Sequence, residues 1–160
     1  MAKKNFWLGM LAMVLALGMS VVGCDNGTTS NVINVDGVWV SREGIEVHFR
    51  HGEVEIVFDG ILLGKGIFTI SGNNITFHPT HMYIDSVWAN GLGIDSGLYT
   101  RSELITALQN SLYVQDIFTD NYIITAILAE ENITFEFDFS PSMGIVNGNT
   151  LIWEGAVFTR

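Results

Sequence analysis

Residues 45–58 read IEVHFRHGEVEIVF, so apolar and polar side chains alternate on both sides of His51-Gly52. Apolar residues occupy every second position before this dipeptide and again after it: Ile45, Val47, Phe49, Val54, Ile56 and Phe58. A period of two is typical of a β-strand that buries one face and exposes the other. A dipeptide ending in glycine between two such runs favours a tight turn. The segment therefore predicts an antiparallel β-hairpin.

The same alternation continues through much of the chain. Further strands are predicted at 65–70 and 74–78 around Ser71-Gly72-Asn73, at 122–129, at 133–139, at 144–147 and 150–153 around Gly148-Asn149, and at 156–159. About eight to ten short antiparallel strands are typical of a closed barrel or a sandwich. We therefore expect an all-β, mainly antiparallel fold, either an up-and-down β-barrel or a flattened sandwich.

One helix is predicted within this β pattern. Thr100-Arg101-Ser102-Glu103 fits a capping box, in which the first and fourth side chains each bond the other residue's backbone N–H. The apolar residues that follow at helical spacing are Leu104, Ile105, Leu108 and Leu112. We expect a helix around 101–113 that docks on the barrel, either as a plug or as a lid over a ligand. Residues 87–97, rich in Gly, Asn and Asp, predict a loop.

The N-terminal segment has the features of an export signal. Lys3 and Lys4 precede an uncharged run from Phe6 to Leu17, which is shorter than the ~20 residues that a membrane-spanning helix needs. Val21-Val22-Gly23-Cys24 follows and resembles the lipobox of bacterial lipoprotein precursors. The resemblance implies that residues 1–23 are a cleaved signal peptide and that Cys24 carries acyl chains such as palmitate. We therefore expect a protein of the cell envelope, anchored to a lipid bilayer through Cys24. The sequence does not distinguish the inner from the outer membrane.

Length and charge limit the remaining possibilities. A chain of 160 residues suits one domain, and its single cysteine excludes an intramolecular disulfide. The net charge of −10, which becomes −12 without Lys3 and Lys4, argues against binding to nucleic acid. We expect residues 24–35 to be the lipidated cysteine and a flexible tether, and residues 36–160 to be a single β-barrel domain.

Two motifs resemble those of the lipocalin family. Asp36-Gly37-Val38-Trp39 is similar to the Gly-x-Trp signature on the first lipocalin strand. Residues 66–73 resemble a hairpin of small bacterial lipocalin-like lipoproteins. The resemblance implies a barrel floor formed by Gly37, Trp39 and Arg160, in which the guanidinium lies on the indole ring. It also implies an interior that binds a small hydrophobic ligand.

Aromatic side chains on the predicted strands could line such a ligand site or fill it. The candidates are Phe49, Phe58, Phe68, Phe77, Phe135 and Phe137. An eight-stranded barrel is either just filled by its side chains or wide enough for one small ligand. So many large rings favour a mostly filled interior.

The four histidines form two pairs of equal spacing, His48 with His51 and His78 with His81. Imidazole nitrogens could hold Zn²⁺ or Cu²⁺. However, residues i and i+3 of a strand point to opposite faces, so each pair would have to straddle a strand end to converge. We therefore assign no metal site and leave open whether the four rings converge.

Acidic residues alternate along two of the predicted strands. Glu53, Glu55 and Asp59 fall on one strand, and Glu136 and Asp138 fall on another. Such spacing is typical of a solvent-facing side. The chain has no nucleophile elbow, phosphate-binding loop or dinucleotide-binding loop, so we expect no enzyme and no cofactor.

Three functions remain open from the sequence. The first is a non-enzymatic binding module of the envelope that takes a small hydrophobic ligand. The second is a structural or surface-interaction lipoprotein with a filled core and no small ligand. The third is metal binding through the two histidine pairs.

Overall fold

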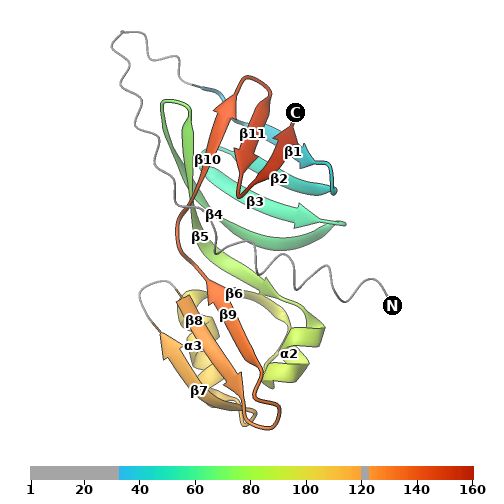
Figure 1. Ribbon diagram of the computed structural model, residues 1–160, viewed down its shortest axis with the longest axis vertical. Helices are drawn as coiled ribbons and strands as arrows, with labels where there is room; N and C mark the ends of the chain where they lie inside the picture. The colour runs from blue at the N-terminus through green and yellow to red at the C-terminus, as the bar shows by residue number, and fades with distance from the viewer. Residues whose placement is uncertain (1–32, 120–122) are drawn as a thin grey trace. The chain divides into compact units, whose positions relative to one another are not determined.

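Eight antiparallel strands close into a barrel in the described part of the chain (Figure 1). This computed structural model describes residues 33–119 and 123–160. The barrel strands are β1 (Gly37–Ser41), β2 (Ile45–Arg50), β3 (Glu53–Phe58), β4 (Ile61–Ser71), β5 (Asn74–Ile84), β10 (Ser142–Asn147), β11 (Thr150–Trp153) and β12 (Ala156–Thr159). Each strand pairs with the next in that order, and β12 pairs with β1 to close the ring. The predicted all-β fold is confirmed, and its sheet closes as a barrel.

Two-residue turns join most neighbouring strands of the barrel. Both turn residues have positive φ at His51-Gly52, Asp59-Gly60 and Glu154-Gly155, as a type I′ turn requires. Only the glycine has positive φ at Gly72-Asn73 and Gly148-Asn149, which fits type II′. The three predicted hairpins are therefore confirmed. Asp59, expected on the exposed face of a strand, lies in a turn because β3 ends at Phe58.

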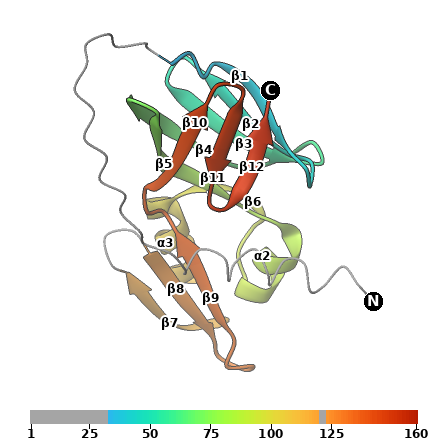
Figure 2. The same cartoon turned by 45° about the horizontal axis from the view of Figure 1, so that its top comes forward.

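A second region is inserted between β5 and β10. Its elements are α2 (Ser86–Leu92), β6 (Gly97–Thr100), α3 (Arg101–Asn110), β7 (Val114–Thr119), β8 (Ile123–Leu128) and β9 (Thr134–Asp138). Strand β6 pairs with the end of β5, whereas β7, β8 and β9 form their own three-stranded sheet (Figure 2). The predicted strands at 122–129 and 133–139 therefore exist as β8 and β9, but they belong to this sheet and not to the barrel.

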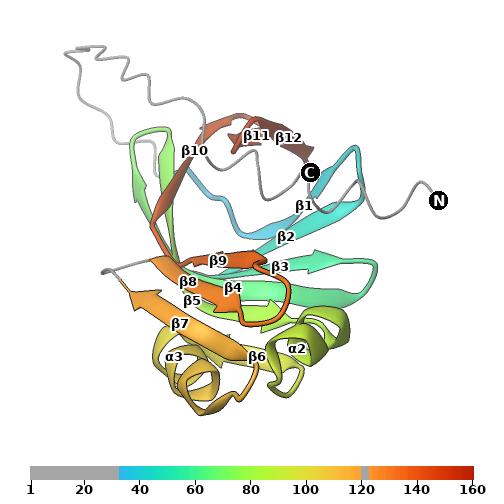
Figure 3. The same cartoon turned by 60° about the horizontal axis from the view of Figure 1, so that its bottom comes forward.

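The barrel and the inserted region have separate hydrophobic cores. The buried residues of the barrel core include Trp39, Val47, Phe49, Val54, Ile75, Phe77, Leu151, Trp153 and Phe158. The core of the inserted region is built from Ile84, Ala89, Leu92, Leu104, Leu108, Ile124, Ala126, Phe135, Phe137 and Phe139. Helices α2 and α3 thus pack on the apolar face of β8 and β9, and both lie on one side of that sheet (Figure 3). The barrel interior is left to the barrel's own side chains.

Helix α3 begins as the sequence predicts and ends earlier. The backbone N–H of Glu103 donates to the Thr100 Oγ1 at 3.2 Å, and the backbone N–H of Thr100 donates to the Glu103 carboxylate at 2.8 Å, which completes the capping box. The helix stops at Asn110, and Leu112 is 96% exposed, so the predicted end at 113 is wrong. Because α3 buries its apolar side against β8 and β9, it neither plugs nor covers the barrel.

Helix α2 lies where a loop was predicted. The Asp85 carboxylate accepts hydrogen bonds from the backbone N–H groups of Val87 and Trp88 at 2.8 and 2.9 Å. Gly93 ends the helix with a φ of 67°. The helix has only seven residues, two of which are buried, so it shows too little apolar periodicity to stand out in the sequence.

The compact unit of the fold begins at Ile33, three residues before the predicted start at Asp36. Val35 is buried and Ile33 packs against the barrel core. The end of the predicted tether is therefore part of the barrel domain.

Candidate functional site

The floor of the barrel is built around Trp39. This side chain is fully buried, and its indole N–H donates to the carbonyl oxygen of Val35 at 2.8 Å. The guanidinium carbon of Arg160 lies 4.7 Å from the ring centroid, and its Nη1 donates to the Asp36 carbonyl oxygen at 3.3 Å. Gly37 has a φ of 127°, which a residue with a side chain rarely adopts. Two residues of the lipocalin-like signature, Trp39 and Arg160, are thus in contact, and Gly37 lies two residues before Trp39 on β1.

Packed aromatic rings fill the barrel interior. Phe49 and Phe68 meet edge to face at 4.9 Å, and Phe77 and Trp153 do so at 5.1 Å between ring centroids. The cavity between them measures about 10 Å³ and is lined by Phe49, Ile75, Phe77, Gly144, Leu151 and Trp153. This volume is about that of one water molecule's probe sphere. The rings are packed at this point, and this cavity has no space for a small organic ligand.

The predicted ligand-lining set divides between the two cores. Phe49, Phe58, Phe68 and Phe77 belong to the barrel core. Phe135 and Phe137 do not, because β9 lies in the inserted sheet, where Phe135 packs 4.8 Å from Trp88. Their assignment to one common site with the barrel rings is therefore wrong.

Trp153 packs against Phe77 inside the barrel, and it is not among the ligand-lining residues that the sequence predicts. Its indole N–H donates to the Ser142 Oγ at 2.8 Å, which fixes the ring between two strands. The inward position of Trp153 could have been predicted from the sequence. Trp153 lies two residues after Leu151 on a short strand, so both side chains point to the same, inward face.

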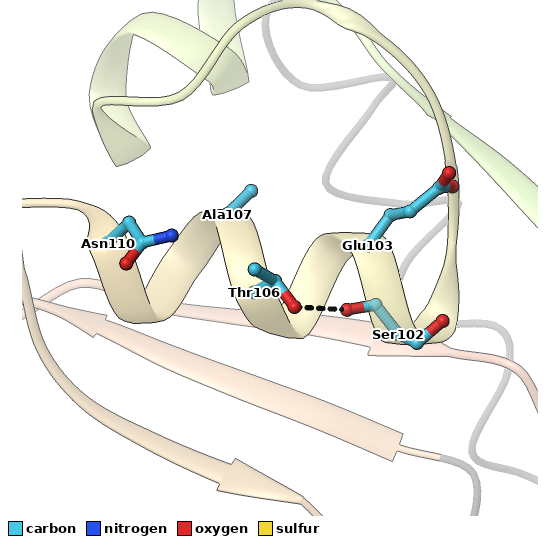
Figure 4. Close-up of a pocket in the computed structure, with 5 residues that line it drawn as sticks. All are labelled: Ser102, Glu103, Thr106, Ala107 and Asn110. Atoms are coloured by element: carbon cyan, nitrogen blue, oxygen red, sulfur yellow. Dashed lines mark hydrogen bonds between the residues drawn. The ribbon is translucent and has the colours of Figure 1, made fainter.

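A surface hollow of about 360 Å³ lies over the outer side of α3 (Figure 4). Its lining comes from a single helix: Ser102, Glu103, Thr106, Ala107 and Asn110. The Thr106 hydroxyl donates to the Ser102 carbonyl oxygen at 2.9 Å, and the Glu103 carboxylate accepts a hydrogen bond from the backbone N–H of Thr100. The polar groups here serve the helix itself, and none of the lining side chains is buried. The hollow therefore lacks the enclosed character of a ligand pocket.

The four histidines lie on different parts of the barrel wall. His48 on β2 pairs with Glu46, with Nε2 and Oε2 2.7 Å apart. His51 lies in the β2–β3 turn. His78 and His81 lie on β5, where the His81 Nδ1 and the Thr80 hydroxyl are 2.9 Å apart. Among the described side chains, those of residues 33–115 and 123–160, no three His, Cys, Asp or Glu residues are grouped as metal ligands would be.

The carboxylates of the two strands point to solvent. Glu53 and Glu55 are exposed on β3, and Glu136 is exposed on β9 beside the half-buried Asp138. Each alternates with apolar neighbours that point inward. The arrangement is that of solvated strand faces, with no pair of acids enclosed in a cleft.

Two other acids have displaced pKa values. Hydrogen bonds from the Thr100 backbone and hydroxyl lower the pKa of Glu103, with a smaller contribution from His81. Partial burial raises the pKa of Glu154, and the nearby Asp138 raises it further, while a hydrogen bond with Ser142 opposes both. Glu103 serves the helix cap beside the open hollow on α3, and Glu154 lies in the β11–β12 turn, so neither lies in an enclosed pocket.

The fold and interior define this chain as a protein with an eight-stranded antiparallel barrel and a filled core. Comparison with family models, with curated proteins and with solved structures gave no match. No helix within the described residues is both long and apolar enough to cross a bilayer. Cys24 and the predicted signal peptide lie outside the described residues.

Proposed function

We propose that this chain is a lipid-anchored protein of the cell envelope whose filled barrel works through its outer surface, as a structural or surface-interaction module. The small volume of the interior cavity, about 10 Å³, supports a function that requires no ligand inside the barrel. Pockets that bind drug-sized ligands usually measure roughly 300–1,000 Å³. In this proposal the barrel is a rigid scaffold and not a carrier.

The anchor in this proposal rests on the N-terminal sequence. Lys3 and Lys4, the apolar run from Phe6 to Leu17 and the lipobox-like residues before Cys24 occur in the order that lipoprotein precursors use. Each buried methylene of an acyl chain contributes about 0.8 kcal/mol, so two or three chains hold a protein stably in a bilayer. The net charge of the chain after Gly23 is −12, which opposes adsorption to an anionic membrane without such an anchor.

A small hydrophobic ligand inside the barrel is the second candidate. The floor formed by Trp39 and Arg160 favours it, because that contact is part of the lipocalin-like signature. Such a ligand would have to displace the rings of Phe77 and Trp153, which now meet in the interior. The filled-core function requires no such rearrangement and is therefore preferred.

The anchor is tested by fractionating cells that express the full chain, with Cys24→Ser as the test variant and Asn26→Ser as a matched control two residues away. We expect the wild type and the control to sediment with membranes and to be released by detergent. Cys24→Ser should appear in the soluble fraction. A Cys24→Ser variant that stays with membranes as fully as the control would contradict the proposed anchor.

A further inference from the structure

Half of the barrel strands carry no charge, although exposed charged residues lie in the turns and ends beside them: Asp36, Arg42, Glu154 and Arg160. Strands β10, β11, β12 and β1 lie side by side and contain no Asp, Glu, Lys or Arg (Figure 2). The neighbouring strands β2 and β3 carry Glu46, Arg50, Glu53 and Glu55. The wall therefore has one side whose strands are uncharged and another whose strands are predominantly acidic.

The uncharged side exposes a continuous row of aliphatic residues. Ile145 on β10 pairs directly with Ile152 on β11, and Ile152 pairs directly with Val157 on β12. Their exposed fractions are 53%, 47% and 52%, and Met143, two residues before Ile145, is 71% exposed. Val40, on the adjacent strand β1, is 40% exposed. Single exposed aliphatic residues are common, whereas contiguous exposed apolar patches are typical of protein or membrane interaction sites.

The tether of the proposed anchor precedes this wall in the sequence. Residues 25–32 separate Cys24 from Ile33, and the first strand after them is β1, which lies next to β12. Cys24 lies 13 residues before Gly37, the first residue of β1, and 13 extended residues span at most about 45 Å. An acyl group on Cys24 therefore holds β1 within that distance of the bilayer, so the uncharged wall is within reach of the membrane surface.

We propose that the row Met143, Ile145, Ile152 and Val157 rests on the surface of the bilayer that holds the Cys24 anchor; this inference rests on the proposed function. The aliphatic side chains enter the boundary between headgroups and acyl chains, which takes up apolar side chains. The acidic strands β2 and β3 then face away, because anionic headgroups repel Glu46, Glu53 and Glu55. The anchor supplies the attachment, and the wall sets the orientation.

The test uses the full acylated chain in vesicles of phosphatidylcholine and phosphatidylglycerol at a ratio of about 7:3. Ile152→Cys places a thiol within the row, and Glu55→Cys places one on the acidic strand β3; acylation of Cys24 leaves the new thiol as the labelling site. Each variant is labelled with an environment-sensitive fluorophore and quenched by spin-labelled lipids. Ile145→Cys serves as a second position in the row, with near-ultraviolet circular dichroism to verify folding.

We expect the labels at 152 and 145 to be quenched at least threefold more strongly than the label at 55. Equal quenching at 152 and 55 in a chain that floats with the vesicles would overturn the membrane-facing row and leave the anchor intact. A chain that does not float would overturn both. Energy transfer between labels on two copies, without lipid quenching, would assign the row to self-association and also overturn the proposal.

Discussion

The guanidinium of Arg160 lies on the indole ring of Trp39, with 4.7 Å between its central carbon and the ring centroid. Arg160 follows β12 and Trp39 lies on β1, so the contact spans the seam at which the barrel closes. The same arginine donates a hydrogen bond to the carbonyl oxygen of Asp36. The floor contact thus covers the fully buried tryptophan and joins the first and last strands of the barrel.

Arg160→Ala should lower the free energy of unfolding by about 0.5–1 kcal/mol, the value typical of an exposed cation–π contact. Urea denaturation of the variant measures the loss. Arg42→Ala, at an exposed turn residue, is the control and should change stability by less. Equal losses in the two variants would show that the contact with Trp39 contributes nothing.

Gly66→Ala should destabilise the barrel by about 2–3 kcal/mol, the usual cost of overpacking a core. A methyl group at Gly66 would overlap the His78 carbonyl oxygen and lie 2.6 Å from the Phe77 ring. Gly97→Ala is the matched control, because its methyl group would have its nearest neighbour at 3.9 Å. Thermal unfolding of both variants measures the difference. A Gly66→Ala variant as stable as Gly97→Ala would refute the close approach of β4 and β5 at Gly66.

Glu154→Gln should stabilise the protein at pH 7 and have little effect below about pH 4, where the carboxyl is protonated in both states. The pKa of Glu154 is raised in the fold by partial burial and then by Asp138. The folded state thus holds the proton more tightly than the unfolded state, and stability is lost as the pH rises through the folded pKa. We expect a gain below about 1 kcal/mol, because solvent screens the side chain.

Urea titrations of Glu154→Gln and wild type between pH 4 and pH 7 measure this effect. Glu131→Gln, at an exposed residue of the β8–β9 connection, provides the control. A stability difference that does not change with pH would contradict the assigned cause.

Phe77→Ala should open a cavity in the barrel and cost about 3–5 kcal/mol. Phe77 is 7% exposed and packs against Trp153, so its removal leaves an apolar void. Apolar voids of this kind stay dry and take up benzene. We expect benzene to raise the melting temperature of Phe77→Ala and to leave that of the wild type unchanged. A similar rise in the wild type would show that space already exists in the native barrel.

The barrel hairpins could be predicted from the sequence because their determinants are local. Alternating residues and a two-residue turn such as His51-Gly52 lie within one short segment and require nothing from distant parts of the chain. The Trp39 and Arg160 pair came from resemblance to a family signature, since no local pattern joins residues so far apart in the sequence.

The inserted sheet could not be distinguished from the barrel by the same means. Phe135 and Phe137 on β9 alternate as cleanly as Ile45 and Val47 on β2, yet they face a different core. Alternation gives the buried face of a strand but not its partner, which depends on pairing between distant segments. Whether a barrel interior is filled also depends on how side chains from distant strands pack together. Trp153 is an example of such a side chain.

In the proposed function, the barrel interior is filled and the protein works through its outer surface. Native mass spectrometry of the full chain, purified from its host in mild detergent, tests it most directly. We predict the mass of the polypeptide with its covalent acyl groups and nothing more inside the barrel. A stoichiometric non-covalent small molecule, retained in the native spectrum and lost on denaturation, would contradict the account.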